Sequence, residues 1–171
     1  MAVKEVLLLG NPVLYTVSQD VDPSESSLIA RVIEDLHDTL IDFRSRYGAG
    51  RAIAAPQIGV MKRLIYMYID SPTVFINPVL EDKSSELFEV WDDCLCFPDL
   101  FVKVKRHNRC RIRYYDTDFT QREMLLEDDL SELVQHEYDH LDGILAVSRA
   151  VDGNSFALRS QRRHIDGKPV S

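Results

Sequence analysis

Two histidines lie four residues apart in the segment His136-Glu137-Tyr138-Asp139-His140. On a helix this spacing puts both imidazoles on one face, about one turn apart, so that both can bind one metal ion. A metal ion lowers the pKa of its bound water toward about 7, and a neighbouring glutamate can accept that water's proton and pass it on. The segment therefore predicts metal-dependent hydrolysis, although the same spacing also arises by chance on surface helices.

The third metal ligand does not lie in this segment. In one class of metalloproteases a further histidine follows; Gly143 fits that longer pattern, but Ala146 stands where the histidine should be. Another class uses a downstream glutamate, and no glutamate follows Glu137. We therefore expect an upstream ligand or an aspartate. Cys94 is the best upstream donor because a thiolate binds borderline-soft divalent metals well, and Cys96 competes with it because alternate strand positions share a face.

Two helices are predicted. The histidine segment belongs to a helix over residues 129–142 that stops at Gly143. Glu137 lies in the apolar stripe of this helix, where an unpaired carboxylate is costly unless it has a function. The clearest helical period runs over residues 28–47, with a start signal at Asp22-Pro23-Ser24 and a stop at Gly48. We interpret this first helix as scaffold.

Short β-type runs lie between the helices, after a glycine- and alanine-rich loop over residues 50–59. Turn residues separate these runs, which cover residues 63–69, 74–76, 87–91, 101–104 and 109–115. The pattern predicts an α+β fold with small, mostly antiparallel sheets around a central metal-binding helix and the N-terminal helix packed outside. From about residue 152 the chain is polar and basic, so we expect a solvated, partly frayed tail, with a short helix over residues 155–163 as the alternative.

Length and charge limit the class of protein. A chain of 171 residues fits one domain over residues 1–171. The 28 acidic residues outnumber the 20 basic ones, for a net charge of −8, which argues against nucleic-acid recognition and a basic membrane-binding helix. There is no apolar run of about 18 residues and no signal-peptide pattern. An odd count of 3 cysteines is not a disulfide framework, so we expect a cytoplasmic protein.

Three segments together resemble the peptide deformylase family, metal hydrolases that remove formyl from the N-terminal methionine of new proteins. Residues 50–59 (GRAIAAPQIG) are similar to the family's Gly-x-Gly-x-Ala-Ala-x-Gln segment. Residues 92–96 (DDCLC) occupy the place of Glu-Gly-Cys-Leu-Ser, and residues 135–143 (QHEYDHLDG) match the third segment closely. Order and spacing agree over about residues 3–150.

The resemblance implies roles for individual residues. Its implied metal ligands are Cys94, His136 and His140. It implies Glu137 as the general acid/base, and the Gln57 side-chain amide with the Leu95 backbone N–H as the oxyanion hole, where donors stabilise charge on the formamide oxygen. It implies one divalent metal ion, Fe(II) first, with Zn, Ni or Co able to occupy the site.

Four residues depart from the family pattern: Arg51, Ala52, Asp93 and Cys96. The residues expected to contact substrate are Gly50, Arg51, Ala52, Asp93 and Leu133. Leu133 is compatible with the apolar pocket that takes the methionine side chain in the family. For Asp93 we weigh an outward-facing surface position against three roles: raising the pKa of metal-bound water, pairing with Arg51, or binding a cationic part of a substrate. Asp92 is expected to pair with Arg106.

These residues predict a hydrolase that removes the N-formyl group from the N-terminal methionine of newly made polypeptides and releases formate. The alternative is a deformylase-like amide hydrolase acting on a different formylated or acylated small molecule or peptide, which the substrate-side departures favour. A non-catalytic metal-holding protein would need neither Glu137 nor Gln57. The expected partner is a formylated peptide, with transient ribosome contact through the basic tail, no nucleic-acid specificity and no membrane.

Overall fold

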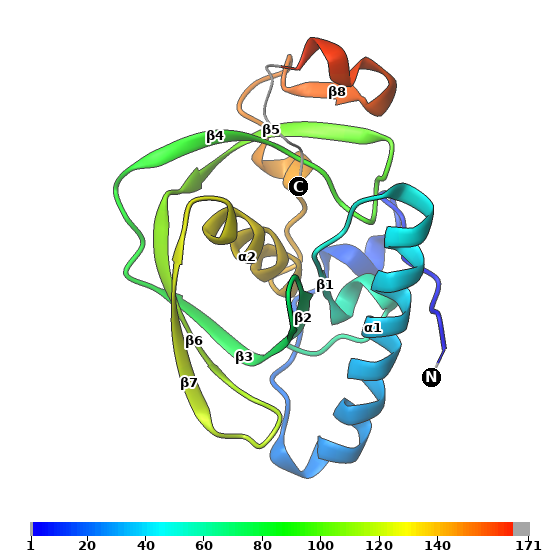
Figure 1. Ribbon diagram of the computed structural model, residues 1–171, viewed down its shortest axis with the longest axis vertical. Coiled ribbons are helices and arrows are strands. Elements are labelled where there is room, and N and C mark those ends of the chain that lie inside the picture. Colours follow the sequence, from blue (N-terminus) through cyan, green and yellow to red (C-terminus); the bar gives the residue numbers. More distant parts are fainter. Residues whose placement is uncertain (1, 166–171) are drawn as a thin grey trace.

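The computed structural model describes residues 2–165 and places helix α2 (Asp128–Leu141) between two antiparallel sheets (Figure 1). The larger sheet has the order β1-β2-β3-β6-β7, and the smaller has the order β4-β5-β8. Their strands are β1 (Ala52–Ala54), β2 (Leu64–Tyr68), β3 (Pro72–Glu81), β4 (Leu87–Asp92), β5 (Leu100–His107), β6 (Arg109–Tyr115), β7 (Gln121–Glu127) and β8 (Phe156–Leu158). This arrangement confirms the predicted α+β class.

Helix α2 is held by packing along its length and by a close contact at its end. Its apolar side packs on Phe75, Ile112 and Leu126 of the larger sheet. At its C-terminal end Gly143 has φ +70°, and a Cβ there would lie 2.5 Å from the carbonyl oxygen of Tyr15. Only glycine allows both this backbone conformation and this approach of the N-terminal arm, which confirms the predicted stop.

Helix α1 (Ser26–Tyr47) covers the outer face of β1 and β2. Side chains alternate along these strands, so that Ile53 faces α1 whereas its neighbours face α2. The predicted start signal forms a short 3₁₀ helix, η2 (Pro23–Glu25), and Gly48 ends α1 with φ +67°. The other 3₁₀ helices are η1 (Pro12–Tyr15), η3 (Ala55–Ile58), η4 (Ala146–Arg149) and η5 (Arg159–His164). Within residues 2–165, no helix has the length and apolar character to cross a membrane.

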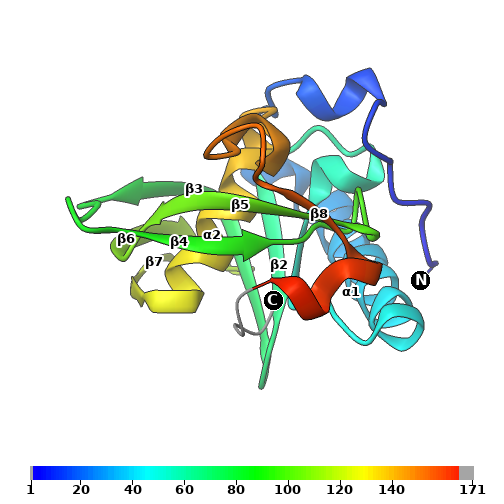
Figure 2. The same ribbon diagram turned by 90° about the horizontal axis from the view of Figure 1, so that it is seen from above.

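The expected frayed tail is wrong through residue 165. Residues Phe156–Leu158 form β8, which pairs with the start of β5 (Figure 2), and η5 follows in place of the alternative helix over residues 155–163. The backbone bonds to β5 and the burial of Ile165 (8% exposed) hold this polar segment in place. The basic residue Lys168 lies outside the described residues.

Two other strands were also not predicted from the sequence pattern. The segment expected as a loop over residues 50–59 contains β1, and β7 was not predicted at all. The strand expected over residues 74–76 was also expected to end in a turn at Asn77-Pro78, but β3 continues to Glu81 through a bulge there. Asn77 has φ +48°, and its side chain bonds to the backbone of Val21. These elements form because neighbouring strands supply hydrogen bonds that a local pattern does not reveal.

Candidate active site

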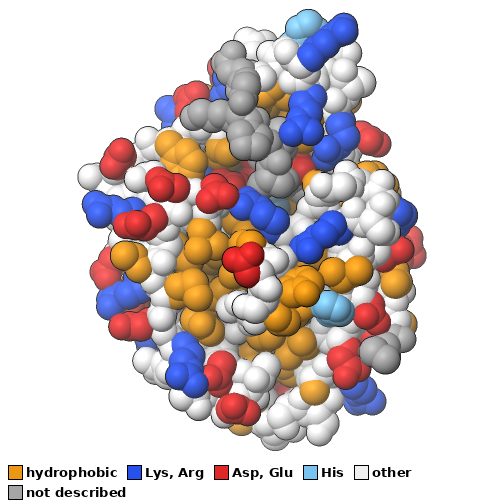
Figure 3. Space-filling view, viewed as in Figure 1, with side chains coloured by type: hydrophobic (Ala, Val, Ile, Leu, Met, Phe, Trp, Pro, Cys, Tyr) orange, Lys and Arg blue, Asp and Glu red, His pale blue; other side chains and the backbone are white. Residues whose placement is uncertain are grey.

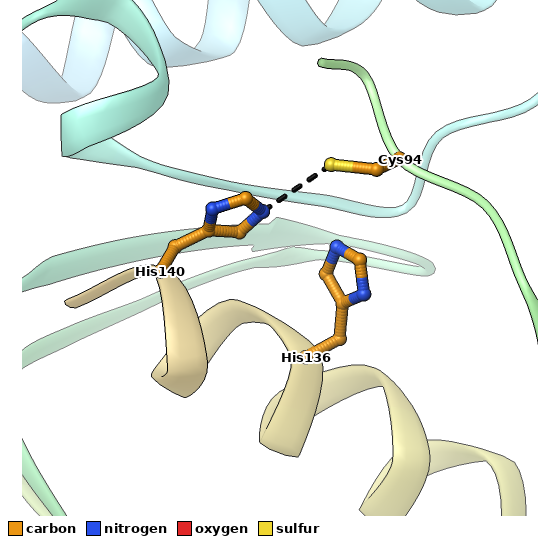
Figure 4. A group of neighbouring side chains, drawn as sticks. All are labelled: Cys94, His136 and His140. Carbon is orange, nitrogen blue, oxygen red and sulfur yellow. Dashed lines mark hydrogen bonds between the residues drawn. The ribbon is translucent and has the colours of Figure 1, made fainter. Parts of the chain in front are cut away.

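The three predicted metal ligands meet between the two sheets. His136 and His140 lie one turn apart on α2, and Cys94 lies on the loop that follows β4 (Figure 4). Their ligand atoms all lie within 4.8 Å of one another, and the Cys94 Sγ is 3.3 Å from the His140 Nε2. All three are buried. Atoms bound to one ion at about 2.0–2.3 Å lie about 3–4 Å apart, so this sulfur and nitrogen set fits a divalent metal. The grouping favours Cys94 over Cys96.

A chain of buried charges supports His136. Its Nδ1 lies 2.8 Å from the Asp92 carboxylate, which also accepts a 2.9 Å bond from Arg106. The expected pairing of Asp92 with Arg106 is therefore confirmed. Holding Nδ1 in this way fixes the ring and leaves Nε2 for the metal site. Burial opposes the charged form of Asp92, but the neighbouring His136 and Arg106 outweigh it and hold the pKa of Asp92 well below its usual range.

The same arginine extends the network to the other side of α2. Arg106 donates a 2.6 Å bond to Asp139, and Asp139 accepts two more bonds from Arg149 on η4, at 2.6 and 2.8 Å. Sequence reasoning did not identify Asp139 or Arg149, because a pairing between distant segments leaves no local pattern.

Glu137 lies in the same buried region beside the ligands and is 3% exposed. Among the described residues, its Oε2 has no hydrogen-bond partner. Burial raises the pKa of Glu137 to about 7, with the charge of His136 acting in the opposite direction. A carboxyl group with a pKa near neutrality can both accept and release a proton. The position fits the predicted acid/base, and the role itself stays a prediction.

Gln57 presents its amide nitrogen to the site. Its Oε1 accepts a 2.7 Å bond from the backbone N–H of Ala54, which orients the side chain. Its Nε2 then lies 3.5 Å from the sulfur atoms of both Cys94 and Cys96. Leu95, between the two cysteines, lines the adjoining pocket. The site therefore combines a metal-ligand set, a proton-transfer group and a buried N–H donor, the parts needed to hydrolyse an amide.

Comparison with known proteins decides the family. The family model for polypeptide deformylase matches residues 3–155. The chain belongs to the peptide deformylase family. Peptide deformylase 1 of Prochlorococcus marinus is 40% identical over 94% of this chain and 88% of its own length. The crystal structure of the Thermotoga maritima peptide deformylase covers 89% of this chain and 100% of its own, with a TM-score of 0.81 and 29% identity. A Met-Ala-Ser bound deformylase from Acinetobacter baumannii covers 86% of this chain and 98% of its own, with a TM-score of 0.79 and 28% identity.

The residues expected to contact substrate in this deformylase-family chain line one small pocket. This pocket of about 20 Å³ adjoins the ligand set, and a space of that size holds about one water molecule. The expected contact residues that line it are Gly50, Arg51, Ala52, Asp93 and Leu133. Their contact with a substrate stays a prediction.

Asp93 pairs with a different arginine from the one weighed in the sequence analysis. Its carboxylate lies 3.2 Å from the Arg159 guanidinium, which also donates to the Pro98 carbonyl and lies 4.7 Å from the centre of the Phe101 ring. The Asp93 side chain is 13% exposed, so an outward surface position is also wrong. Burial, and then the nearby Asp92, raise the pKa of Asp93, and the Arg159 charge opposes them. Arg159 belongs to the C-terminal segment that was expected to be frayed, so the sequence did not predict this pairing.

Arg51 turns to α2 instead of Asp93. Its guanidinium lies 2.7 Å from Asp129 and 3.6 Å from Glu132. Glu132 is 1% exposed and was not identified from the sequence, because it lies off the apolar stripe and fits the pattern of a solvent-facing residue. Its position one turn before His136 is the signal that could have drawn attention to it.

Proposed function

We propose that this deformylase-family hydrolase removes the N-formyl group from the N-terminus of peptides in a metal-dependent reaction and releases formate. The observation that carries the proposal is the buried Glu137 beside a Cys94, His136 and His140 ligand set that fits one divalent metal. Formyl-methionine at the start of newly made polypeptides is the reference substrate, supported by the Met-Ala-Ser bound relative.

A divalent ion, Fe(II) first and Zn, Ni or Co otherwise, held by Cys94, His136 and His140 would supply the Lewis acid that activates water and polarises the formyl carbonyl. Glu137 accepts the proton of the attacking water and delivers it to the departing amine. The Gln57 amide and the Leu95 backbone N–H donate to the carbonyl oxygen as its negative charge grows. A C–O bond forms, the C–N bond breaks, and formate and a free N-terminus leave.

The setting of the reaction is part of the proposal. An enzyme acting on newly made chains would work in the cytoplasm, and transient ribosome contact through the basic segment from about residue 152 stays a prediction. A second candidate, hydrolysis of a different formylated or acylated compound, is favoured by the charged Arg51 and Glu132 on the substrate side of the site.

The test is formate release from formyl-Met-Ala-Ser by protein purified without oxygen and loaded with Fe(II) or Ni. We expect Glu137→Gln to keep the metal and to lose turnover by about 10²–10⁴-fold, the usual contribution of general acid–base catalysis. A near-normal rate in this variant would show that Glu137 is not the acid/base. Absence of formate from every formylated peptide, with metal loaded, would rule out the proposed function.

A further inference from the structure

Glu132 is a buried carboxyl group to which the proposed reaction gives no role. Its side chain is 2% exposed, and it lies on α2 one helical turn before His136. It lies at ion-pair distance from Arg51, whose Nη2 is 3.6 Å from its Oε2. Burial and then the neighbouring Asp92 raise the pKa of Glu132, and His136 and Arg106 act in the opposite direction. Burying a carboxyl group beside another carboxylate is costly, so this position is poorly explained by packing alone.

Arg51 separates the small pocket beside the metal ligands from a larger open groove of about 450 Å³, and it lines both. Tyr68, Val90 and Glu132 also line the groove. A substrate group that extends from the ligand set toward the groove must therefore pass Arg51. On the face drawn in Figure 3, acidic and basic side chains lie next to one another near the centre, with hydrophobic side chains on either side.

Two nitrogen atoms of the Arg51 guanidinium donate no hydrogen bond to the described residues. Its Nη1 bonds to Asp129 at 2.7 Å, whereas its Nε and Nη2 are buried and find no hydrogen-bond partner among residues 2–165. These N–H groups of Arg51 and the carboxyl group of Glu132 therefore lie on one side of the groove, which we call its wall. A thioether is a poor hydrogen-bonding partner for these buried groups and would leave them unsatisfied, which lowers affinity relative to a side chain that bonds to them.

A neutral polar side chain matches this wall better. A carboxamide accepts from the Arg51 N–H groups with its oxygen and donates to Glu132 with its nitrogen, and a hydroxyl group does the same with one atom. Asp129 already balances the guanidinium, and burial raises the pKa of Glu132 and so favours its neutral form. The wall therefore offers no unpaired charge to an ionic side chain.

We propose that Arg51 and Glu132 bind the side chain of the formylated residue, and that they select a neutral hydrogen-bonding side chain, carboxamide or hydroxyl, over methionine. This inference rests on the proposed function, because it assigns the residue that carries the formyl group. It makes Arg51 and Glu132 specificity determinants of this chain.

The test compares formyl-Gln-Ala-Ser with formyl-Met-Ala-Ser, whose first side chains have nearly equal length and differ in their polar end. We expect kcat/KM of the metal-loaded enzyme to favour the glutamine peptide by at least about tenfold, within the range that a site built for hydrogen bonds achieves. Calorimetric binding of both peptides to Glu137→Gln should give the same order without turnover. Formyl-Ser-Ala-Ser should also exceed formyl-Met-Ala-Ser.

The double variant Arg51→Leu/Glu132→Leu should reverse the order in favour of methionine. Arg51→Leu alone, at a position with a partly exposed side chain, should reduce the preference and serves if the double variant does not fold. The matched control is Arg46→Leu/Glu123→Leu, which makes the same exchanges at exposed sites on α1 and β7 and should leave the preference unchanged.

The outcomes separate the two proposals. A wild-type preference for formyl-methionine that the Arg51 and Glu132 variants do not alter would overturn this inference and leave the proposed function standing. Absence of formate from all three peptides would overturn the proposed function, and the binding order in Glu137→Gln would then decide the inference.

Discussion

Two clusters of buried charges lie beside the metal ligands, and their ion pairs differ. We call Asp92, Arg106, His136 and Asp139, with the other metal ligands, the catalytic wall, and Arg51 and Glu132 the substrate wall. On the catalytic wall, the carboxylate of Asp92 bonds to both His136 and Arg106, and Arg106 continues to Asp139. On the substrate wall, Arg51 and Glu132 face each other at 3.6 Å with N–H donors left over. Both walls keep buried polar atoms without a partner among residues 2–165, Arg106 Nε on one and Arg51 Nη2 on the other. They differ because a direct bond from Asp92 fixes the orientation of His136, whereas no hydrogen bond joins Arg51 to Glu132 until a ligand group lies between them.

The strongest test of the catalytic wall removes a ligand. We expect Cys94→Ala to lose the metal and, with it, all turnover, because only two ligands remain. Cys96→Ala is the matched control and should keep the metal, since its sulfur lies outside the ligand set. Elemental analysis of both purified variants decides the matter. Loss of metal from Cys96→Ala alone would exchange the roles of the two cysteines.

Gln57→Leu should have the next largest effect on the reaction. Removing one oxyanion donor lowers kcat by about 10²–10³-fold, while the metal content should stay the same. Steady-state kinetics of formate release at saturating peptide measures the change. If only KM changed, the amide of Gln57 would be a binding group and not a donor to the developing charge.

Asp92→Asn compares the two walls directly. Without the carboxylate that holds its Nδ1, His136 loses its fixed orientation, and metal affinity should fall by about 10–100-fold. Glu132→Gln, a similar change on the substrate wall, should leave metal affinity unchanged. Competition with a chelator measures both. Equal losses in the two variants would mean that the walls are not separate in function.

Arg159→Met should have the smallest effect. Its side chain is 26% exposed and that of Asp93 is 13% exposed, so the loss of free energy of unfolding should lie at or somewhat above about 0.2–1 kcal/mol, the contribution of a fully exposed pair. Urea denaturation measures this loss. The variant Asp93→Gly/Arg159→Met should be no less stable than the sum of the two single changes predicts, because removing both partners leaves neither carboxylate nor guanidinium unpaired. A greater than additive loss would argue against a direct pairing.

The sequence predicted the catalytic wall better than the substrate wall, for a physical reason. A helix fixes the distance between positions four residues apart, so His136 and His140 could be placed on one face from spacing alone. The polar anomaly of Glu137 in an apolar stripe was equally visible. In contrast, the partners of Arg51 and Asp93 depend on how distant segments dock, and spacing carries no information on that.

The secondary structure was likewise predicted better where a local pattern determines it than where a distant partner does. The long amphipathic helix α1 was predicted within two residues at its start, and β6 was predicted with its bounds. Strand β7 escaped because it is an edge strand whose residues are largely exposed, and β8 escaped because its pairing with β5 joins segments far apart in the chain. Edge strands owe their form to a neighbour rather than to an apolar pattern of their own.

The ligand set draws on both layers of the molecule. Cys94 follows a strand of the three-stranded sheet, whereas His136 and His140 lie on the helix that packs on the five-stranded sheet. A bound ion would therefore cross-link the layers and raise the free energy of unfolding, by about 2.7 kcal/mol when the free ion is at 100 times its Kd. Heat or denaturant that parts the layers also dismantles the site, so thermal inactivation and unfolding should follow one common curve.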